Sequence, residues 1–273
     1  MTVDRRKLLL GLAGLGLASP ALVSPVRAAI QQPYQKLGVE LYTVRQAFAA
    51  DPRGTLQKIK AMGYDQVETN GYGGLTPAAL KTLLGEIGLT VPAVHIGLDD
   101  WRTRPEAVLD EASVLGTNYV VLAWIPPEQR GDWKGLANNL NLWGEMASQR
   151  GLKFGYHNHD FEFAGHGHDM PFHVLLDETD PLLVAIELDC YWCSLAGHDP
   201  VHVIREHGDR IRVLHLKDKT AAGEMAPVGE GVIPFGDVLV QAKSAGVEYV
   251  FVEHDNPADP FASLAMSYKN LRG

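Results

Sequence analysis

Short apolar runs rich in β-branched residues alternate along the chain with longer segments whose apolar residues recur every three to four positions. The short runs are typical of buried parallel strands, and the longer segments are typical of amphipathic helices. Strands are therefore expected at eight places, with helices between them: Leu37–Tyr42, Gln66–Thr69, Val91–His95, Tyr119–Leu122, Lys153–Tyr156, Val184–Leu188, Ile211–Leu214 and Tyr249–Val252.

Glycine and proline mark the ends of the helical segments. Gly63, Gly88 and Gly116 stand just after the last apolar position of their segments, where a left-handed residue commonly ends a helix. Pro77 and Pro105 stand where the next helices should begin. Eight strand–helix units in about 235 residues predict parallel pairing and a closed (β/α)₈ TIM barrel of the α/β class, as one domain over residues 30–273.

The loops that follow the strands lie on the carboxyl-terminal face of such a barrel. The longest stretches without a helical or strand pattern are Gly97–Arg104, His157–Asp169 and Lys217–Ile233. All three follow an expected strand. Because long loops in a compact domain are usually functional, we expect this face to carry the site.

The first 29 residues have a different pattern from the rest. The charged segment Asp4–Lys7, with its paired arginines, precedes the apolar run Leu8–Leu17, and small residues follow at Val26–Ala29. This order is typical of a twin-arginine export signal. A membrane anchor is the alternative, but the run is shorter than the ~20 residues that a span needs. We therefore expect a cleaved signal over residues 1–29 and a periplasmic protein with no stable membrane insertion afterwards.

The net charge bears on the kind of binding partner, and the two cysteines bear on the redox state of the protein. The formal net charge is −9 at pH 7. It becomes −12 when residues 1–28, which hold four basic residues and one acidic residue, are removed. An acidic chain argues against a nucleic-acid partner. Cys190 and Cys193 have a C-x-x-C spacing but no thioredoxin-type turn around them, which favours two buried free thiols over a redox pair.

Ionisable and aromatic residues gather where the expected strands end, which is where barrel enzymes place their chemistry. Carboxylates crowded at one rim repel each other unless a cation lies among them. A mixed set of oxygen and imidazole donors suits one divalent metal ion: Mn²⁺, Mg²⁺, Co²⁺, Zn²⁺ or Fe²⁺. The alternative is a rim of hydrogen-bonded polar residues. The strand-end residues are Glu40, Tyr42, Glu68, Asn70, His95, Trp124, His157, His159, Glu162, Glu187, Asp189, His215, Lys217, Glu253 and Asp255.

Side chains alternate between the two sides of a strand. Glu187 and Asp189 are therefore expected on the same side, with Glu187 one layer below the metal as a support.

The strand ends resemble the xylose isomerase-like superfamily of sugar phosphate isomerases and epimerases. The resemblance covers the mature chain from about Gly38 to Leu271 and implies a (β/α)₈ barrel with one divalent metal in its carboxyl-terminal mouth. The segments that carry it are Gly155–Phe163, Glu187–Trp192, Ala196–Pro200, His215–Asp218, Gly229–Phe235 and Val252–Asp255.

The resemblance also implies the metal ligands, since the family uses Glu, Asp, His and Glu from strands five to eight. Asp189, His215 and Glu253 match the last three. For the first ligand, Glu162 is favoured over His157, which stands where many members have a glutamate.

Other residues match substrate-contacting positions. His95 and Lys217 do so on strand three and after strand seven, and Glu40 is a further candidate. Trp124 and Trp192 offer flat faces to a sugar, although packing in the core explains each of them equally well.

The family's common chemistry is proton removal beside a carbonyl, with the metal stabilising an enediolate. Glu253 or Glu162 is expected to act as the base, His157 or His159 as the other proton carrier, and Lys217 to steady developing negative charge. The leading expectation is an isomerase or epimerase that acts on a carbohydrate or keto-sugar. The close alternative is a lyase or hydratase that eliminates from 3-keto-glycosides.

Two other classes of protein are alternatives to this enzyme. A non-catalytic periplasmic sugar-binding barrel is an alternative of another class. The superfamily also contains metal-dependent repair nucleases, but the charge and the export signal argue against that activity. A homodimer is a further expectation from the resemblance, although no apolar stripe in the sequence indicates one.

Overall fold

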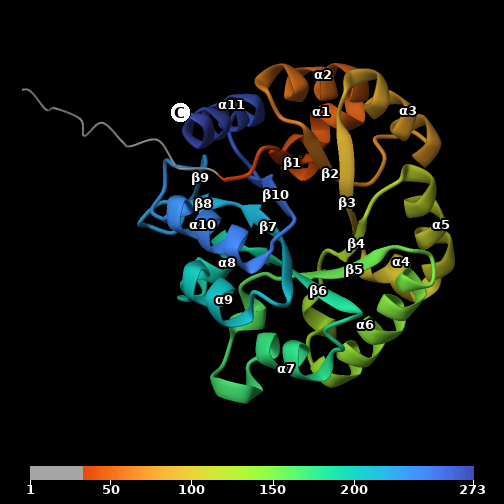
Figure 1. Ribbon diagram of the computed structural model, residues 1–273, viewed down its shortest axis with the longest axis vertical. Coiled ribbons are helices and arrows are strands. Elements are labelled where there is room, and N and C mark those ends of the chain that lie inside the picture. The colour runs from red at the N-terminus through yellow and green to blue at the C-terminus, as the bar shows by residue number, and fades with distance from the viewer. Residues whose placement is uncertain (1–32) are drawn as a thin grey trace, which may run out of the picture.

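The strands form the expected closed barrel (Figure 1). The computed structural model describes residues 33–273, so the predicted export signal at residues 1–29 lies outside the described residues. All eight strands are parallel, in the order β1-β10-β7-β6-β5-β4-β3-β2. Their bounds are Gly38–Glu40 (β1), Gln66–Asn70 (β2), Thr90–Ile96 (β3), Tyr119–Leu122 (β4), Lys153–His157 (β5), Val184–Asp189 (β6), Ile211–Leu216 (β7) and Tyr249–Val252 (β10).

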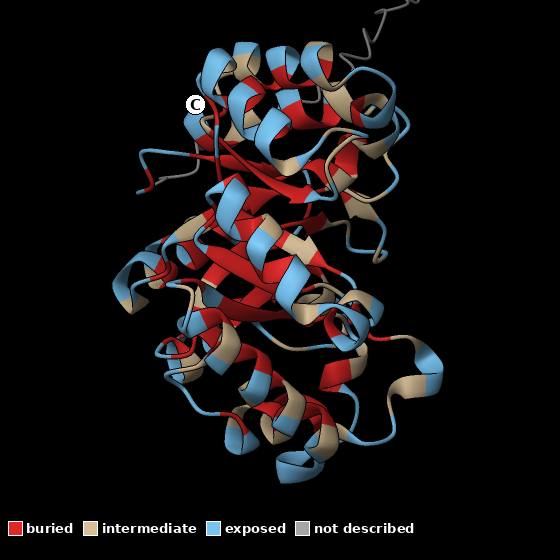
Figure 2. Cartoon of the chain, turned by 90° about the vertical axis from the view of Figure 1, so that its right-hand side faces the viewer, coloured by how far each residue is buried: buried red, intermediate tan, exposed pale blue. Residues whose placement is uncertain are grey.

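Helices surround the strands and bury one face each against them, as the colours of Figure 2 show. Gly63, Gly88 and Gly116 end α2, α3 and α5 in the left-handed conformation, as their positions predict. The α-helices are Arg45–Ala50 (α1), Pro52–Met62 (α2), Pro77–Ile87 (α3), Leu98–Thr103 (α4), Pro105–Leu115 (α5), Trp133–Ser148 (α6), Pro171–Glu178 (α7), Cys190–Leu195 (α8), Pro200–His207 (α9), Phe235–Ala245 (α10) and Pro260–Arg272 (α11).

Four short 3₁₀ helices complete the helical elements of the described chain: Leu41–Val44 (η1), Pro127–Gln129 (η2), Phe161–Phe163 (η3) and Gly167–Asp169 (η4). Tyr42, expected at the end of the first strand, lies in η1 instead. The Glu40 side chain accepts a hydrogen bond from the Tyr42 N–H and so turns the chain out of the strand.

All three stretches expected to be irregular contain secondary structure, and His157–Asp169 holds the 3₁₀ helices η3 and η4. Gly97–Arg104 holds helix α4, whose first turn carries Asp99 and Asp100, a placement that the helix dipole favours. The helix has only six residues, too few for a clear apolar period.

The stretch Lys217–Ile233 holds the hairpin of β8 (Asp218–Lys219) and β9 (Met225–Ala226). The Asp218 carboxylate accepts hydrogen bonds from four backbone N–H groups, those of Lys219, Gly229, Gly231 and Ile233. One buried side chain therefore folds this loop, and it fixes the chain directly after Lys217.

The lower end of the barrel is filled by apolar side chains. Ala93, Tyr119, Val121, Val213 and Phe251 form a buried cluster inside the strands. Glu187, His215 and Glu253 lie beyond this cluster, toward the carboxyl ends of the strands. Among residues 33–273, no helix is long and apolar enough to cross a membrane.

Candidate active site

A pocket of about 380 Å³ opens at the carboxyl ends of the strands, within the size range of small-molecule sites. Its walls come from β2, β3 and β5 and from the segments that follow β1, β4, β5, β7 and β10. The residues that line it are Tyr42, Asn70, His95, Ala123, Trp124, His157, His159, Lys217, Glu253 and Asp255.

Three of the four predicted metal ligands converge at this pocket. Donor atoms of Asp189, His215 and Glu253, which we call the outer triad, lie within 4.8 Å of one another. His215 Nδ1 is 2.8 Å from Glu253 Oε2 and 3.9 Å from Asp189 Oδ2. The residues come from the end of β6, from β7 and from the position after β10, so the barrel itself sets their spacing.

The two oxygens of Asp189 have different surroundings. Oδ1 caps helix α8 by accepting a hydrogen bond of 2.9 Å from the Trp192 N–H. Oδ2 is buried and makes no hydrogen bond to any described residue. This oxygen has Lys217 Nζ at 3.2 Å but lacks a hydrogen bond, and it lies beside an imidazole nitrogen and a second carboxylate, a donor set that fits a divalent cation.

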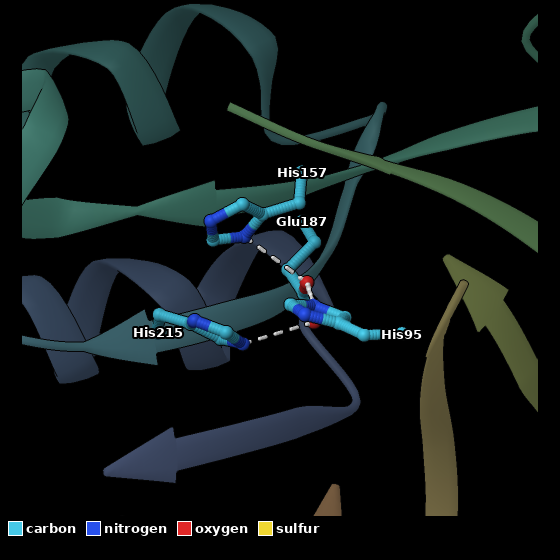
Figure 3. A group of neighbouring side chains, drawn as sticks. All are labelled: His95, His157, Glu187 and His215. Atoms are coloured by element: carbon cyan, nitrogen blue, oxygen red, sulfur yellow. Dashed lines mark hydrogen bonds and ion pairs between the residues drawn. The ribbon is translucent and has the colours of Figure 1, made fainter. Parts of the chain in front are cut away.

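A second group lies deeper in the barrel. His95, His157, Glu187 and His215, which we call the inner tetrad, also bring donor atoms within 4.8 Å of one another (Figure 3). As alternation predicts, Glu187 and Asp189 both face the barrel interior, and both contact His215. His215 is common to the two groups.

Lys217 bridges the carboxylates of the pocket. Its Nζ is 3.2 Å from Asp189 Oδ2, 2.9 Å from Glu253 Oε2 and 2.7 Å from Asp255 Oδ1. Burial alone lowers the pKa of Lys217, but the three carboxylates outweigh it and hold this pKa well above the usual value. Burial likewise opposes ionisation of Glu253, yet Lys217 and His215 hold its pKa well below the usual range. The site is therefore a network of paired charges.

The four histidines around the pocket form two pairs that differ in the direction of their pKa shift. Burial lowers the pKa of His95 and of His215, but Glu187 in particular outweighs it and both pKa values are raised. Burial lowers the pKa of His157 to about 4 and strongly lowers that of His159, with less compensation from carboxylates. His157 and His159 are therefore neutral near pH 7.

Glu162, predicted as the first metal ligand, belongs to neither group of donor atoms in the described chain. Its Oε1 accepts a hydrogen bond from the Tyr156 hydroxyl, and its Oε2 accepts one of 2.8 Å from the His159 N–H. The residue is fully buried and does not line the pocket. In this structure Glu162 holds the backbone of His159 in place.

The predicted substrate-contacting residues lie at different depths. His95 and Trp124 line the pocket, and Trp124 is 44% exposed. Trp192 packs beside His159, with ring centroids 5.3 Å apart, and Lys217 Nζ lies 5.6 Å from its ring centre. Glu40 is fully buried at the end of β1.

Asp255 and Glu68 are strand-end residues for which the sequence alone predicted no role. Asp255 pairs with Lys217, and Glu68 Oε2 lies 2.6 Å from His215 Nε2. Asp255 stands two residues after Glu253, and this even spacing was the available signal for a side chain on the same side. Cys190 and Cys193 are both free and buried, in agreement with the expectation.

Comparison with known proteins gives relatives of one family. Residues 56–270 match the family described as Xylose isomerase-like TIM barrel. The inosose dehydratase of Geobacillus thermodenitrificans is 31% identical over 165 residues, which cover 52% of this chain and 54% of that protein. The chain thus spans about half the length of this curated relative.

Solved structures show the same fold. A sugar phosphate isomerase/epimerase from Parabacteroides distasonis superposes with a TM-score of 0.75 at 23% identity, covering 93% of this chain and 99% of that one. The 3-keto-D-glucoside 4-epimerase from E. coli gives a TM-score of 0.66 at 18% identity, covering 88% and 99%. Since the family match extends over most of the sequence, the chain belongs to the xylose isomerase-like TIM barrel family.

Proposed function

We propose that this protein is a metal-dependent enzyme that removes a proton beside the carbonyl of a keto-sugar and then eliminates a group from the neighbouring carbon. The observation that carries the proposal is the outer triad at the pocket, with unlike proton-carrying groups on its two sides. The similarity to inosose dehydratases supports elimination as the outcome.

Asp189, His215 and Glu253 would hold one divalent ion: Mn²⁺, Mg²⁺, Co²⁺, Zn²⁺ or Fe²⁺. Such an ion supplies a Lewis acid that polarises a carbonyl oxygen. For a fourth ligand, His157 is better placed than Glu162. Its Nε2 is 4.0 Å from Asp189 Oδ2, whereas both oxygens of Glu162 already accept hydrogen bonds.

His159 is the proton acceptor in this proposal. Its Nδ1 makes no hydrogen bond in the described chain, and burial lowers its pKa, which keeps the ring neutral with a free lone pair. The ring is held between Phe161 and Trp192, with centroid distances of 5.5 and 5.3 Å. A neutral imidazole fixed at the pocket wall can take a proton from a bound substrate.

Lys217 and Glu253 act from the other side of the pocket. They directly follow β7 and β10, which lie two and three strands away from β5 in the barrel. The Lys217 ammonium steadies the negative charge that develops when the proton leaves. Glu253 is ionised, so on this side the same ammonium is the group that carries a proton for the leaving group. Elimination uses such a pair of unlike groups, one to take the proton and one to assist the leaving group.

The charge of the pocket favours an uncharged substrate. Of the described residues that line it, Lys217 is the only permanent cation, and it is already paired with three carboxylates. A phosphate group would meet Glu253 and Asp255 without a free cation. We therefore propose an unphosphorylated keto-sugar or keto-glycoside, which also suits the export to the periplasm predicted from residues 1–29.

Isomerisation or epimerisation is the second candidate. Proton carriers approach the pocket from two sides, His159 from one and the Lys217 ammonium from the other. A proton taken on one side and returned on the other would invert the carbon rather than eliminate a group.

The test is incubation of the metal-loaded protein with 3-keto-glycosides and cyclic keto-polyols in D₂O, followed by NMR. We expect deuterium beside the carbonyl together with an α,β-unsaturated ketone and a released leaving group. Recovered stereoisomers with solvent deuterium would instead assign epimerisation. No exchange with any substrate of the panel would contradict both.

Three variants separate the roles of the residues. Asp189→Asn keeps the helix cap but loses the anionic ligand, so bound metal and turnover should both fall, kcat/KM by at least about 100-fold. His159→Gln should retain metal and lose about 10²- to 10⁴-fold in kcat. Asp199→Asn is the matched control, because Asp199 caps helix α9 in the same way but is exposed and outside the pocket. Full activity with normal metal content in Asp189→Asn would refute the ligand assignment.

A further inference from the structure

The inner tetrad is a compact set of donor atoms beneath the outer triad. Its side chains come from four strands, β3, β5, β6 and β7, and converge on the Glu187 carboxylate (Figure 3). Glu187 and His215 are fully buried, His157 is almost so, and the His95 side chain is only 7% exposed. The position is therefore enclosed by protein.

Two distances within the tetrad are close to those between ligands of one metal ion. Glu187 Oε2 is 3.2 Å from His157 Nδ1, and Glu187 Oε1 is 3.4 Å from His215 Nε2. Glu187 Oε2 also makes a hydrogen bond of 2.6 Å with His95 Nε2, which an ion would have to replace. With metal–ligand bonds of about 2.1 Å, neighbouring ligands in a tetrahedral site lie about 3.4 Å apart. Small shifts of the side chains would give this geometry.

Two atoms of the tetrad lack the hydrogen bonds that buried polar atoms normally make. His157 Nδ1 and Glu187 Oε1 are buried, and neither makes a hydrogen bond to any residue that the structure describes. Both face the other members of the tetrad at ion-pair distances. A buried polar atom that lacks its hydrogen bond costs about 1–3 kcal/mol, and a bound cation would supply the missing interaction.

We propose that the inner tetrad is a second cation site, separate from the ion of the proposed function and selective for a borderline metal such as Zn²⁺ or Co²⁺. The reason is its donor set of three imidazoles and one carboxylate, which is the chemistry of zinc sites. The outer triad has two carboxylates and one imidazole, a harder set that suits Mn²⁺ or Mg²⁺.

The shared histidine makes the two sites competitors. His215 presents Nε2 to the inner tetrad and Nδ1 to the outer triad. A neutral imidazole has one lone pair, so it can coordinate through only one of these nitrogens. An ion in the inner tetrad therefore removes His215 from the outer triad.

Glu68 favours the outer arrangement. Its Oε2 lies 2.6 Å from His215 Nε2 and accepts a hydrogen bond when the proton is on that nitrogen. This leaves the lone pair on Nδ1, toward Asp189 and Glu253. The position of one proton on His215 thus decides which site can use this histidine. His157 is shared in the same way, because its Nε2 is the candidate fourth ligand of the outer ion and its Nδ1 belongs to the inner tetrad.

Cobalt titration of the metal-free full-length protein tests the proposal, because tetrahedral Co²⁺ absorbs visible light far more strongly than Co²⁺ with more ligands. We expect the intense absorption in wild type and in Glu253→Gln, which lacks an outer ligand. Glu187→Gln should lose it, with Zn²⁺ affinity lowered at least about 10-fold and Mn²⁺ affinity kept. Glu248→Gln, at the opposite end of the barrel, is the control and should match wild type.

The intense absorption in Glu187→Gln, or its loss in Glu253→Gln alone, would overturn the proposal. If Glu187→Gln does not fold, His95→Asn removes a different inner ligand and gives the same test. These measurements use no substrate. Failure of the proposed reaction therefore leaves the inner site standing, and failure of the inner site leaves the reaction standing.

Discussion

The inside of the barrel has two layers that come from the same strands but differ in chemistry. On β6, β7 and β10 the chain carries an apolar residue facing inward and, two positions later, an ionisable one. The lower layer is closed by Ala185, Val213 and Phe251, and the upper layer continues on the same strands with Glu187, His215 and Glu253.

This difference separates stability from chemistry along each strand. Burial of the lower layer removes apolar surface from water, which stabilises the fold by about 25 cal/mol per Å². The upper layer buries charges instead, and a buried ion pair often contributes no more stability than apolar residues of similar size. The upper layer therefore serves binding and catalysis, whereas the lower layer stabilises the fold by packing.

Among the variants that distinguish the two layers, Phe251→Ala should have the largest effect on stability. The ring is fully buried in the lower layer, so its removal should lower the free energy of unfolding by about 3–5 kcal/mol through lost burial and a cavity. Metal stoichiometry should stay that of wild type, because Phe251 supplies no ligand. Denaturant unfolding and metal analysis on the same samples would measure both.

Leu182→Ala is the control for this variant. Leu182 is 91% exposed, and its truncation should change the free energy of unfolding by less than about 0.5 kcal/mol. Loss of metal from Phe251→Ala without loss of stability would show that the two layers cannot be separated in this way.

The layers also differ in how far the sequence alone could predict them. The barrel followed from strand runs and helix ends, and the convergence of Asp189, His215 and Glu253 followed from their place at the ends of neighbouring strands. Their grouping needs only the rule that parallel strands end on one face. The short helix α4 and the hairpin held by Asp218 were missed, because neither depends on an apolar period.

The inner tetrad could not be predicted, because it depends on register and strand tilt. His95 on β3 meets Glu187 on β6, with β4 and β5 between them in the barrel. The pairing of β6 with β7 shifts between Ile186 and Glu187, and that of β2 with β3 shifts between Gln66 and Glu68. Such shifts re-aim side chains, and no sequence pattern marks them here.

The pH dependence of stability also distinguishes the two layers, because among the described residues the buried carboxyls lie in the upper region of the barrel. Burial raises the pKa of Glu162 from 4.5 to about 7. Between these values the folded chain keeps this proton and the unfolded chain releases it, so the free energy of unfolding falls as pH rises from about 4.5 to 7. A shift of this size corresponds to about 3 kcal/mol.

Glu162→Gln should therefore reduce the fall in stability over this pH range by up to about 3 kcal/mol relative to wild type. Urea unfolding at several pH values would measure the difference between the two curves. Phe251→Ala should lower the whole curve without changing its slope. An unchanged slope in Glu162→Gln would show that this carboxyl is ionised in the folded chain throughout the range.

A smaller effect than that of Phe251→Ala is expected for the fit within the lower layer. Gly38 on β1 has no side chain, and a Cβ atom at this position would overlap the ring of Phe251. Gly38→Ala should therefore cost about 1–3 kcal/mol by overpacking. If the cause is this one contact, Gly38→Ala combined with Phe251→Leu should cost less than the sum of the two single changes. Additive costs in denaturant unfolding would place the strain elsewhere, in the β1 backbone, and would show that the lower layer tolerates a larger side chain beside Phe251.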